Sequence, residues 1–449
     1  MARADVAVVG AGLAGLTAAI QLAEAGAHVQ VMAAGHAATH WAPGGMDVGA
    51  TPGAGSAQEA VDQLARIDGH PYGFLAGQLP AALAWLRGLL AAAGIDLVGE
   101  LDDPLRAVPT AIGSTRLAAI LPDGMAAALP PWTTDETLVV CGPAGFREFW
   151  PDAIAASLRR ASSWRGQPGP SRVEALTVEL PGLAGRHNLS SLDLARAFDD
   201  PGWRLLALDA IARAIEGRVA GPGRLAFPAV LGLNDHPAVL AAARARLPLA
   251  PFEVALVPPS VPGLRMFTAL RSAVRRHGGR IQVGEAVHGH VRADGQVELR
   301  APAAAREFVL SAGAVILATG GIAGGGIVVE QGGDLVETVL GLPVEGPPIG
   351  SGLLDDPFDP AGHPLESAGI RTDAHLRPFA RSAADGPAGK VRIAGSLLAG
   401  QRYLRQRCGD GVAIASGRLA ALELQAAGAS SGPVAMAPTV GAGTGQIRP

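Results

Sequence analysis

Cysteine is scarce in this chain, and its scarcity excludes two classes of protein. Among 449 residues only Cys141 and Cys408 are cysteines. Two thiols cannot build the disulfide framework of a small secreted domain, and they cannot hold an iron–sulfur cluster on four thiolates of this chain. A reducing, cytoplasmic setting is the simplest interpretation.

Charged and aromatic residues are also few. Charged residues make up 17% of the chain, aromatic residues 4%, and the formal net charge is -4. This composition lacks the basic footprint of a nucleic-acid-binding protein. No zinc-ligand spacing, Ser–His–Asp motif or pair of catalytic carboxylates stands out, so no metal site is predicted. The length suits an α/β enzyme of two or three domains.

Two long uncharged runs have the length of membrane or signal segments. Residues 6–23 start with β-type residues and continue through glycines into a helical pattern, which does not fit a signal peptide. Residues 308–329 include six glycines, each of which costs a helix about 1 kcal/mol. We therefore expect a buried strand followed by a turn there, and no transmembrane segment.

The first residues have the pattern of a nucleotide-binding βαβ unit. Residues 5–9 form an apolar run, residues 13–25 have helical periodicity, and residues 28–32 form a second apolar run. Between the first run and the helix lies GAGLAG, which fits the G-x-G-x-x-G pattern in its required context.

The glycines of this turn have separate expected roles. Gly10 permits the tight turn, Gly12 lets a phosphate approach the backbone, and Gly15 lets helix and strand pack closely. Together with Leu13 and Ala14 they open a helix whose free amides and positive dipole end suit an anionic group. These five residues are predicted to bind the cofactor.

The second strand ends at Ala33, where such units usually carry an acidic residue for the adenosine ribose. Alanine cannot make that hydrogen bond, so dinucleotide binding is weakened but not excluded. FMN has no adenosine ribose and loses nothing. FMN is therefore the first choice of cofactor, with FAD as the alternative.

Three later segments favour a flavin over a nicotinamide. They are GEAV (284–287), AVILATGG (314–321), and IAGSLLAG with CGDGVAIASG (393–400 and 408–417). The last is expected to place a helix N-terminus at the pyrimidine edge of the ring, where its dipole stabilises the reduced anion. The cofactor-binding residues predicted here are Val287, Thr319, Gly320, Gly395, Gly411 and Val412.

The fold predicted from these features is α/β, a Rossmann-like FAD/NAD(P)-binding fold with an inserted α/β domain. Residues 1–135 and 262–427 are assigned to the flavin-binding domain, 136–261 to the insert, and 428–449 to a mobile tail. The insert is expected to begin with a strand near Thr137 and a helix from Phe146.

Several stretches together resemble the B subunits of the anaerobic glycerol-3-phosphate dehydrogenases. They are ATHWAPGGMDV (38–48), HPYGFLAG (70–77), RHNLSSLDLARAF (186–198), PPSVPGLRM (258–266), RHGGRIQVGEAV (276–287) and GIRTDAHLRP (369–378). The resemblance extends from Asp5 to about Ala426. Two features depart from it: the loop Gln401–Arg407 is unusually basic, and Asp410 replaces a glycine.

The resemblance implies oxidation of sn-glycerol 3-phosphate to dihydroxyacetone phosphate, with electrons passed to a quinone. It implies FMN, a second flavoprotein (the A subunit), and an iron–sulfur subunit that docks the pair on the cytoplasmic face of the inner membrane. Two alternatives stay open: a non-catalytic or relaying flavin-fold subunit that supports a catalytic partner, and a flavin oxidoreductase of another substrate.

Alcohol oxidation needs a base, and a phosphate monoester needs cationic partners. His40 follows the second strand, in the segment expected to run beside the ring with Gly45, and is the predicted base. Arg265 and Arg116 are the predicted phosphate ligands, because arginine donates in a bidentate fork. Arg371 and Arg377 are second choices.

Overall fold

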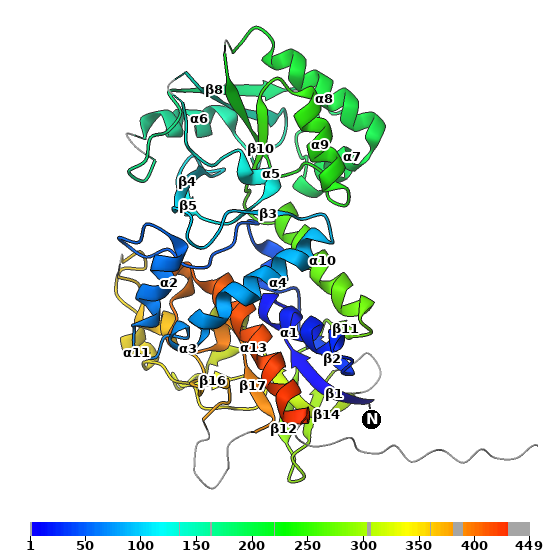
Figure 1. Ribbon diagram of the computed structural model, residues 1–449, viewed down its shortest axis with the longest axis vertical. Coiled ribbons are helices and arrows are strands. Elements are labelled where there is room, and N and C mark those ends of the chain that lie inside the picture. Colours follow the sequence, from blue (N-terminus) through cyan, green and yellow to red (C-terminus); the bar gives the residue numbers. More distant parts are fainter. Residues whose placement is uncertain are drawn as a thin grey trace, which may run out of the picture.

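The computed structural model describes residues 2–133, 135–161, 164–219, 221–302, 307–359, 361–379 and 389–429. These residues form two units, each with its own sheet and its own hydrophobic core (Figure 1). The predicted tail lies outside the described residues, apart from its first two positions, which end the last helix.

The larger unit is built on a seven-stranded sheet in the order β11-β2-β1-β14-β13-β12, and β17 also pairs with β14. The strands are β1 (Ala2–Val9), β2 (Val29–Ala33), β11 (Arg280–Val283), β12 (His288–Val291), β13 (Val297–Ala301), β14 (Phe308–Leu317) and β17 (Val391–Ile393). β1 and β14 are parallel, with Val9 opposite Leu317. The turns that follow these two strands therefore open at the same edge of the sheet.

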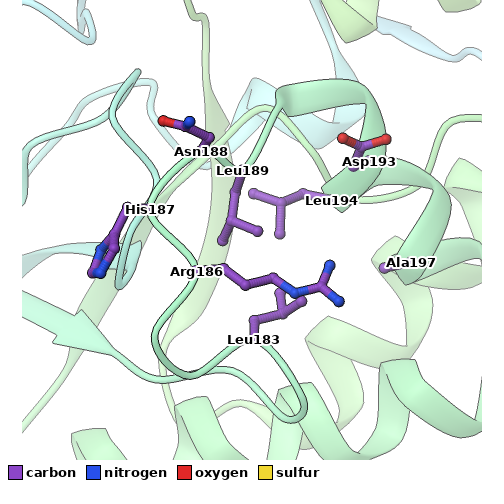
Figure 2. A pocket seen from close by; sticks show the side chains of 8 residues that line it. All are labelled: Leu183, Arg186, His187, Asn188, Leu189, Asp193, Leu194 and Ala197. Carbon is purple, nitrogen blue, oxygen red and sulfur yellow. The ribbon is translucent and has the colours of Figure 1, made fainter.

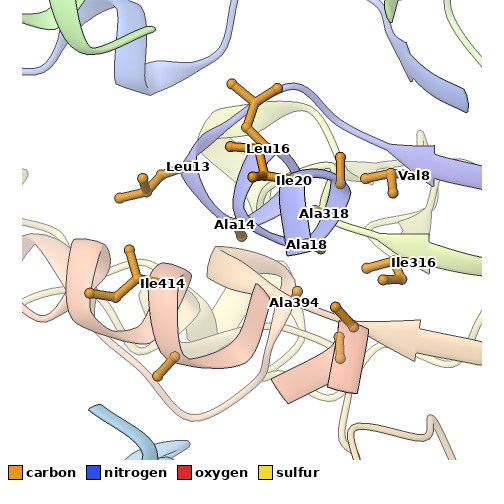
Figure 3. Close-up of a cluster of buried hydrophobic side chains, with 14 of the residues drawn as sticks. Val8, Leu13, Ala14, Leu16, Ala18, Ile20, Ile316, Ala318, Ala394 and Ile414 are labelled. Carbon is orange, nitrogen blue, oxygen red and sulfur yellow. The ribbon is translucent and has the colours of Figure 1, made fainter. Parts of the chain in front are cut away.

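The helices of this unit are α1 (Leu13–Glu24), α2 (Ala57–Ala65), α3 (Tyr72–Leu75), α4 (Leu79–Ala91), α10 (Val261–Arg276) and α13 (Gly409–Ala429). α1 contacts α10 and α13. The side chains of Leu16 and Ile20 are completely buried, and Ala14 and Ala18 lie on the side of α1 that faces α13 (Figure 3). This packing fixes the direction in which the N-terminus of α1 points.

The inserted unit has a four-stranded parallel sheet in the order β10-β9-β7-β8. Its strands are β7 (Thr137–Pro143), β8 (Arg172–Val178), β9 (Gly223–Pro228) and β10 (Ala250–Val254), and its helices are α6 (Pro151–Arg160), α7 (Ser191–Asp199), α8 (Pro201–Ile215) and α9 (His236–Arg246). The first strand lies inside the sheet, so the chain winds outward in both directions, as in doubly wound folds.

Two details of the insert differ from the sequence prediction. Ala107 and Leu121 already belong to the core of the insert, so that core draws on residues before the predicted boundary at 136. The helix expected from Phe146 begins at Pro151, because proline is favoured at the first helical position. Phe146 and Phe149 are instead buried in the connecting loop.

Shorter elements complete the described chain. They are η1 (Ala38–Trp41), η2 (Ala76–Gln78), β3 (Leu97–Val98), β4 (Arg106–Pro109), β5 (Thr115–Ala118), β6 (Leu121–Pro122), α5 (Asp123–Ala126), η3 (Ile322–Gly324), β15 (Ile327–Val329), β16 (Leu335–Glu337), α11 (Ile349–Gly352), η4 (Pro364–Ser367), η6 (Gly395–Leu397) and α12 (Tyr403–Gln406). The uncharged run 308–329 forms β14, η3 and β15, as the glycines predicted.

One helical run among the described residues is long and apolar enough to cross a membrane by length and composition, and it is Tyr72–Ala91. One third of its most apolar window, 33%, is buried inside the protein. Core helices of soluble proteins satisfy the same criterion, so this run is weak evidence of a membrane span.

Candidate functional site

The glycine turn after β1 has no space for side chains at two of its positions. Gly10 has a φ of +115°, and a Cβ there would collide with the carbonyl of Ala318. A Cβ on Gly15 would collide with the carbonyl of Gly10. The turn is therefore as tight as the sequence predicted, and the end of β14 lies directly against it.

The amino end of α1 retains unpaired hydrogen-bond donors. Leu13 N–H donates to Thr39 Oγ1 at 2.9 Å. Among the described residues, the amides of Gly12, Ala14 and Gly15 donate to no protein acceptor. Unpaired amides at a helix N-terminus suit an anionic group such as a phosphate. The space beside Gly12 is bounded by Ala37, whose Cβ lies 3.3 Å from an ideal Gly12 Cβ.

The turn after β14 and the turn after β17 meet beside this end of α1. Gly320 and Gly395 both have positive φ values, 85° and 71°. An ideal Cβ on Gly395 would lie 2.9 Å from the Cβ of Ala14. The hydroxyl of Thr319 is buried and has no partner among the described residues. A buried polar atom without a protein partner is available to a bound group, so these residues fit the predicted cofactor site.

A cavity of about 230 Å³ borders the same turns. It is lined by Gly321, Ile322, Ala323, Leu353, His363, Leu365, Glu366, Ala368, Ser396, Arg402, Tyr403 and Leu404. Ser396 Oγ accepts the Gly321 N–H at 3.2 Å, which ties the two turns together at its wall. The cavity therefore adjoins the predicted cofactor residues Gly320 and Gly395.

The amino end of α13 is occupied by the protein itself. The amides of Asp410 and Gly411 donate to Asp47 O at 3.0 and 3.2 Å, and Val412 N–H donates to Cys408 O. Asp410 Oδ2 accepts the Asp47 N–H at 2.8 Å. A contact between a flavin edge and the amides of Gly411 and Val412 would require these bonds to be exchanged.

Two arginines converge on the same aspartate. Arg116 from β5 and Arg407, just before α13, each donate to Asp47 Oδ1, at 2.7 and 2.9 Å. The Nε of Arg116 is buried and has no partner in the part of the chain that the structure describes. Burial and the Asp47 carboxylate raise the pKa of Asp410 to about 7. Burial also lowers the pKa of Arg116.

His40 lies in η1 and is partly buried. Its ring stacks on His36 at 5.0 Å and meets the edge of Phe267. Its Nδ1 is buried and has no partner among the residues described. Burial, and then the nearby His36, lower the pKa of His40. A neutral ring with an unpaired nitrogen can accept a proton, which is compatible with the role of a base. That role stays a prediction.

Arg265 is engaged with groups of the protein itself, and its predicted role as a phosphate ligand stays a prediction. It donates to Glu253 at 2.7 and 3.0 Å and to Gly232 O at 2.7 Å. Arg265 is 8% exposed and Glu253 2%. Burial favours the neutral acid, but the charges of Arg265 and His236 hold the pKa of Glu253 below its ordinary value. This buried pair joins α10 to the end of β10.

The remaining predicted residues lie in three different settings. Gly45 lies against Leu121, next to the β-bridge between Met46 and Ile120. Val287 is buried, with 7% exposure, in the turn after β11. Arg371 and Arg377 pair at the surface with Glu345 and Asp373.

Three residues at the site were not predicted. Thr39 and Asp47 lie in a stretch that carried the family resemblance without assigned roles, and Arg407 lies in the loop noted only as basic. The groups that these residues contact are mostly distant in the sequence, so spacing could not reveal them. The basic character of residues 401–407 was the one sequence feature that pointed to the site. No cluster of metal-ligating side chains occurs in the part of the chain that the structure describes.

The insert contains a second cavity, of about 550 Å³. The loop after β8 and helix α7 form its wall, and the Arg186 side chain extends across it among Leu183, Leu194 and Ala197 (Figure 2). None of the predicted site residues lines it.

Comparisons with known proteins agree on one family. The sequence model of the FAD binding domain family matches residues 5–412. A probable anaerobic glycerol-3-phosphate dehydrogenase B subunit of Halobacterium salinarum is 32% identical over 92% of this chain and 96% of its own length. The chain belongs to the family of anaerobic glycerol-3-phosphate dehydrogenase B subunits, within the FAD binding domain family. The B subunit of Pectobacterium carotovorum is 30% identical over the same shares of the two chains.

Among solved structures, an E. coli quinol fumarate reductase has a TM-score of 0.42 and 13% identity, covering 96% of this chain and 72% of its own. A 3-ketosteroid delta1-dehydrogenase of Sterolibacterium denitrificans has the same TM-score with 11% identity, covering 95% and 100%.

The family match also bears on the choice of cofactor. A model of FAD binding domains that extends over residues 5–412 supports a flavin, and specifically FAD. It does not support FMN, the first choice that Ala33 suggested. The missing acidic residue at Ala33 therefore does not decide which flavin is bound, because contacts to the adenosine ribose are only one part of dinucleotide binding.

Proposed function

We propose that this chain oxidises sn-glycerol 3-phosphate to dihydroxyacetone phosphate with bound FAD, as the B subunit of a glycerol-3-phosphate dehydrogenase that passes electrons to a quinone. The observation that carries the proposal is the near full-length similarity to relatives with that name. The unpaired amides at the start of α1 support the cofactor part.

In this proposal the FAD pyrophosphate is held by the amides of Gly12, Ala14 and Gly15. Thr319 supplies a hydroxyl that has no partner among the described residues. FAD held here would supply the hydride acceptor for oxidation of the alcohol. Ala33 leaves the adenosine ribose without an acidic partner, so the pyrophosphate contacts carry more of the binding.

The substrate phosphate is assigned to Arg116 and Arg407. Their guanidinium groups lie 2.7 and 2.9 Å from one carboxylate oxygen of Asp47, so two cationic forks point to a common position. A phosphate dianion that bound beside Asp47 would gain charge-assisted hydrogen bonds to the remaining donors of the two guanidinium groups, such as the Nε of Arg116, which is unpaired among the described residues. The exposed fraction of each arginine side chain, 21%, leaves access from solvent.

His40 is the proposed acceptor of the hydroxyl proton. Its depressed pKa keeps the ring neutral at pH 7, and its Nδ1 has no partner among the described residues. A neutral imidazole is the form that a general base needs.

The electrons then leave through partner subunits, proposed as a second flavoprotein and an iron–sulfur protein. The names of the relatives themselves imply partner subunits. With two buried free cysteines, this chain has too few thiols for a four-thiolate cluster of its own. We propose that the partners hold it at the cytoplasmic face of the inner membrane.

The test is to purify the chain, record its visible spectrum, and add glycerol 3-phosphate without oxygen. Flavin absorbance that bleaches supports the proposal, and a bound flavin that no glycerol phosphate reduces contradicts it for the chain alone. Mass analysis of the heat-released chromophore separates FAD from FMN. Arg116→Gln should raise KM for the substrate, whereas Arg106→Gln on the same hairpin should not.

A second candidate function is a flavin-fold subunit that supports a catalytic partner. It is favoured by the amino end of α13, where the backbone carbonyl of Asp47 accepts hydrogen bonds from two amides. One of these amides belongs to Gly411, which was expected to face the flavin. A chain that purifies without flavin, yet restores activity to its flavoprotein partner, would select this candidate. Reduction by another alcohol, but not by glycerol 3-phosphate, would indicate a different flavin oxidoreductase.

A further inference from the structure

Asp410 has no role in the proposed function. Its carboxylate and the Asp47 backbone hold each other reciprocally. Asp410 Oδ2 accepts the Asp47 N–H at 2.8 Å, and the Asp410 N–H donates to Asp47 O at 3.0 Å. These two bonds join positions that are 363 residues apart in the sequence.

Asp47 in turn holds the two arginines assigned to the substrate phosphate. Both guanidinium groups donate to its Oδ1. When both carboxylates are ionised, the four side chains have no net charge. A proton on Asp410 leaves the cluster with one net positive charge, which favours an anion beside Arg116 and Arg407.

We propose that Asp410 is a positioning residue that fixes Asp47 between the two arginines and, by taking up a proton, strengthens the binding of a phosphate or other oxyanion at this site. This inference rests on the assignment of the substrate phosphate under the proposed function. It adds a pH dependence to the binding of the anion.

The surroundings of Asp410 support a proton uptake near neutrality. Burial is the largest cause and the Asp47 charge the second, and together they raise the pKa of Asp410 to about 7 against the pull of Arg116 and Arg407. Tyr72 from α3 and the thiol of Cys408 also face this carboxylate, and both have raised pKa values. Neither of these two groups is charged at neutral pH.

Sulfate is the probe for the test, because its charge does not change over the range used. Sulfate binding to the FAD-loaded protein is measured by calorimetry at about pH 5.5 and about pH 8.5. We expect sulfate to bind about tenfold more tightly at the lower pH, as one added charge near the anion requires. The Asp410→Asn variant should bind sulfate equally tightly at the two pH values. The Arg116→Gln variant should bind sulfate weakly at both pH values.

The matched control is Arg106→Gln, which should behave like the unaltered protein. An equal pH dependence in Asp410→Asn would overturn the proposal, because another group would then be the one that titrates. Absence of sulfate binding at either pH would overturn it as well. Flavin bleaching by glycerol 3-phosphate is measured separately, so loss of the proposed function and loss of this inference are distinguishable.

A second readout does not depend on a ligand. The folded-state pKa of Asp410, about 7, is above the ordinary carboxylate value, so the folded protein binds more protons than the unfolded chain between about pH 4 and pH 7. Stability from this group is therefore complete at low pH and is lost as the pH rises to 7. The difference in Tm between the unaltered protein and Asp410→Asn should follow this curve, and a flat difference would contradict the assignment.

Discussion

Removal of the Arg265 side chain should destabilise the insert rather than impair substrate binding. Arg265 and Glu253 form a bidentate pair with 8% and 2% exposure, and His236, whose pKa is lowered by burial, lies near Glu253 with its Nε2 3.8 Å away. Loss of one partner of a buried pair costs about 3 to 5 kcal/mol, because the other charge stays buried. For a unit of this size, that corresponds to a fall in Tm of roughly 6 to 20 °C.

The assay is denaturant unfolding followed by tryptophan fluorescence. Trp132 and Trp164 lie in contact within the core of the insert, with ring centroids 5.6 Å apart, and report its unfolding. Arg265→Ala should lower the midpoint strongly. The double variant Arg265→Met with Glu253→Leu should recover most of the loss, because it removes both charges and keeps apolar volume. Arg371→Ala, which breaks an exposed pair, should cost about 0 to 1 kcal/mol.

One result would refute this reasoning. If Arg265→Ala unfolded at the same denaturant concentration as the unaltered protein but no longer bound sulfate, Arg265 would be an anion ligand. The buried pair with Glu253 would then not describe the protein in solution.

Three further predictions concern the cofactor turn, the pH dependence of stability and the start of α13. Gly12→Val should abolish FAD retention while the chain stays folded, because its methyl groups fill the space for the phosphate; circular dichroism and flavin content check this, and full flavin content would contradict it. The pKa of His70 is lowered to about 4 by burial, below its ordinary 6.5, so this group binds more protons in the unfolded chain between these values, and the stability that it contributes should fall as the pH drops from 6.5 to 4, opposite to the contribution of Asp410. Thermal melts of His70→Gln should lack that decline. Gly411→Ala should destabilise the protein because its Cβ collides with the Tyr72 hydroxyl, and Tyr72→Phe in the same chain should relieve part of the loss.

Local patterns in the sequence predicted the elements around the glycine turn correctly. The strand, turn and helix of residues 2–24 follow one another directly, and each is specified by its own apolar spacing and by the glycines between them. The sequence also predicted a helix N-terminus within residues 408–417, where α13 begins at Gly409. The start of α6 differs from the expected one because Pro151 occupies the first helical position, where proline is favoured.

The choice of arginine could not be made from the sequence. Arg116 and Arg265 look equally suitable as phosphate ligands when only the chain is known. In the folded protein Arg265 pairs with Glu253, a buried carboxylate of β10. Arg116 is partly exposed and shares the carboxylate of Asp47 with Arg407. The ion pair with Glu253 requires a strand end and a helix start to meet across two units, which residue spacing does not encode.

The sequence alone determined that a glycine turn joins a buried strand to a helix, because each of these features depends on residues close together in the chain. It also determined the family, through stretches spread over most of its length. The tertiary structure alone decided which charges face one another. Asp47 and Asp410 are 363 residues apart, and only the folding of α13 against the loop after η1 brings their backbones within hydrogen-bond distance.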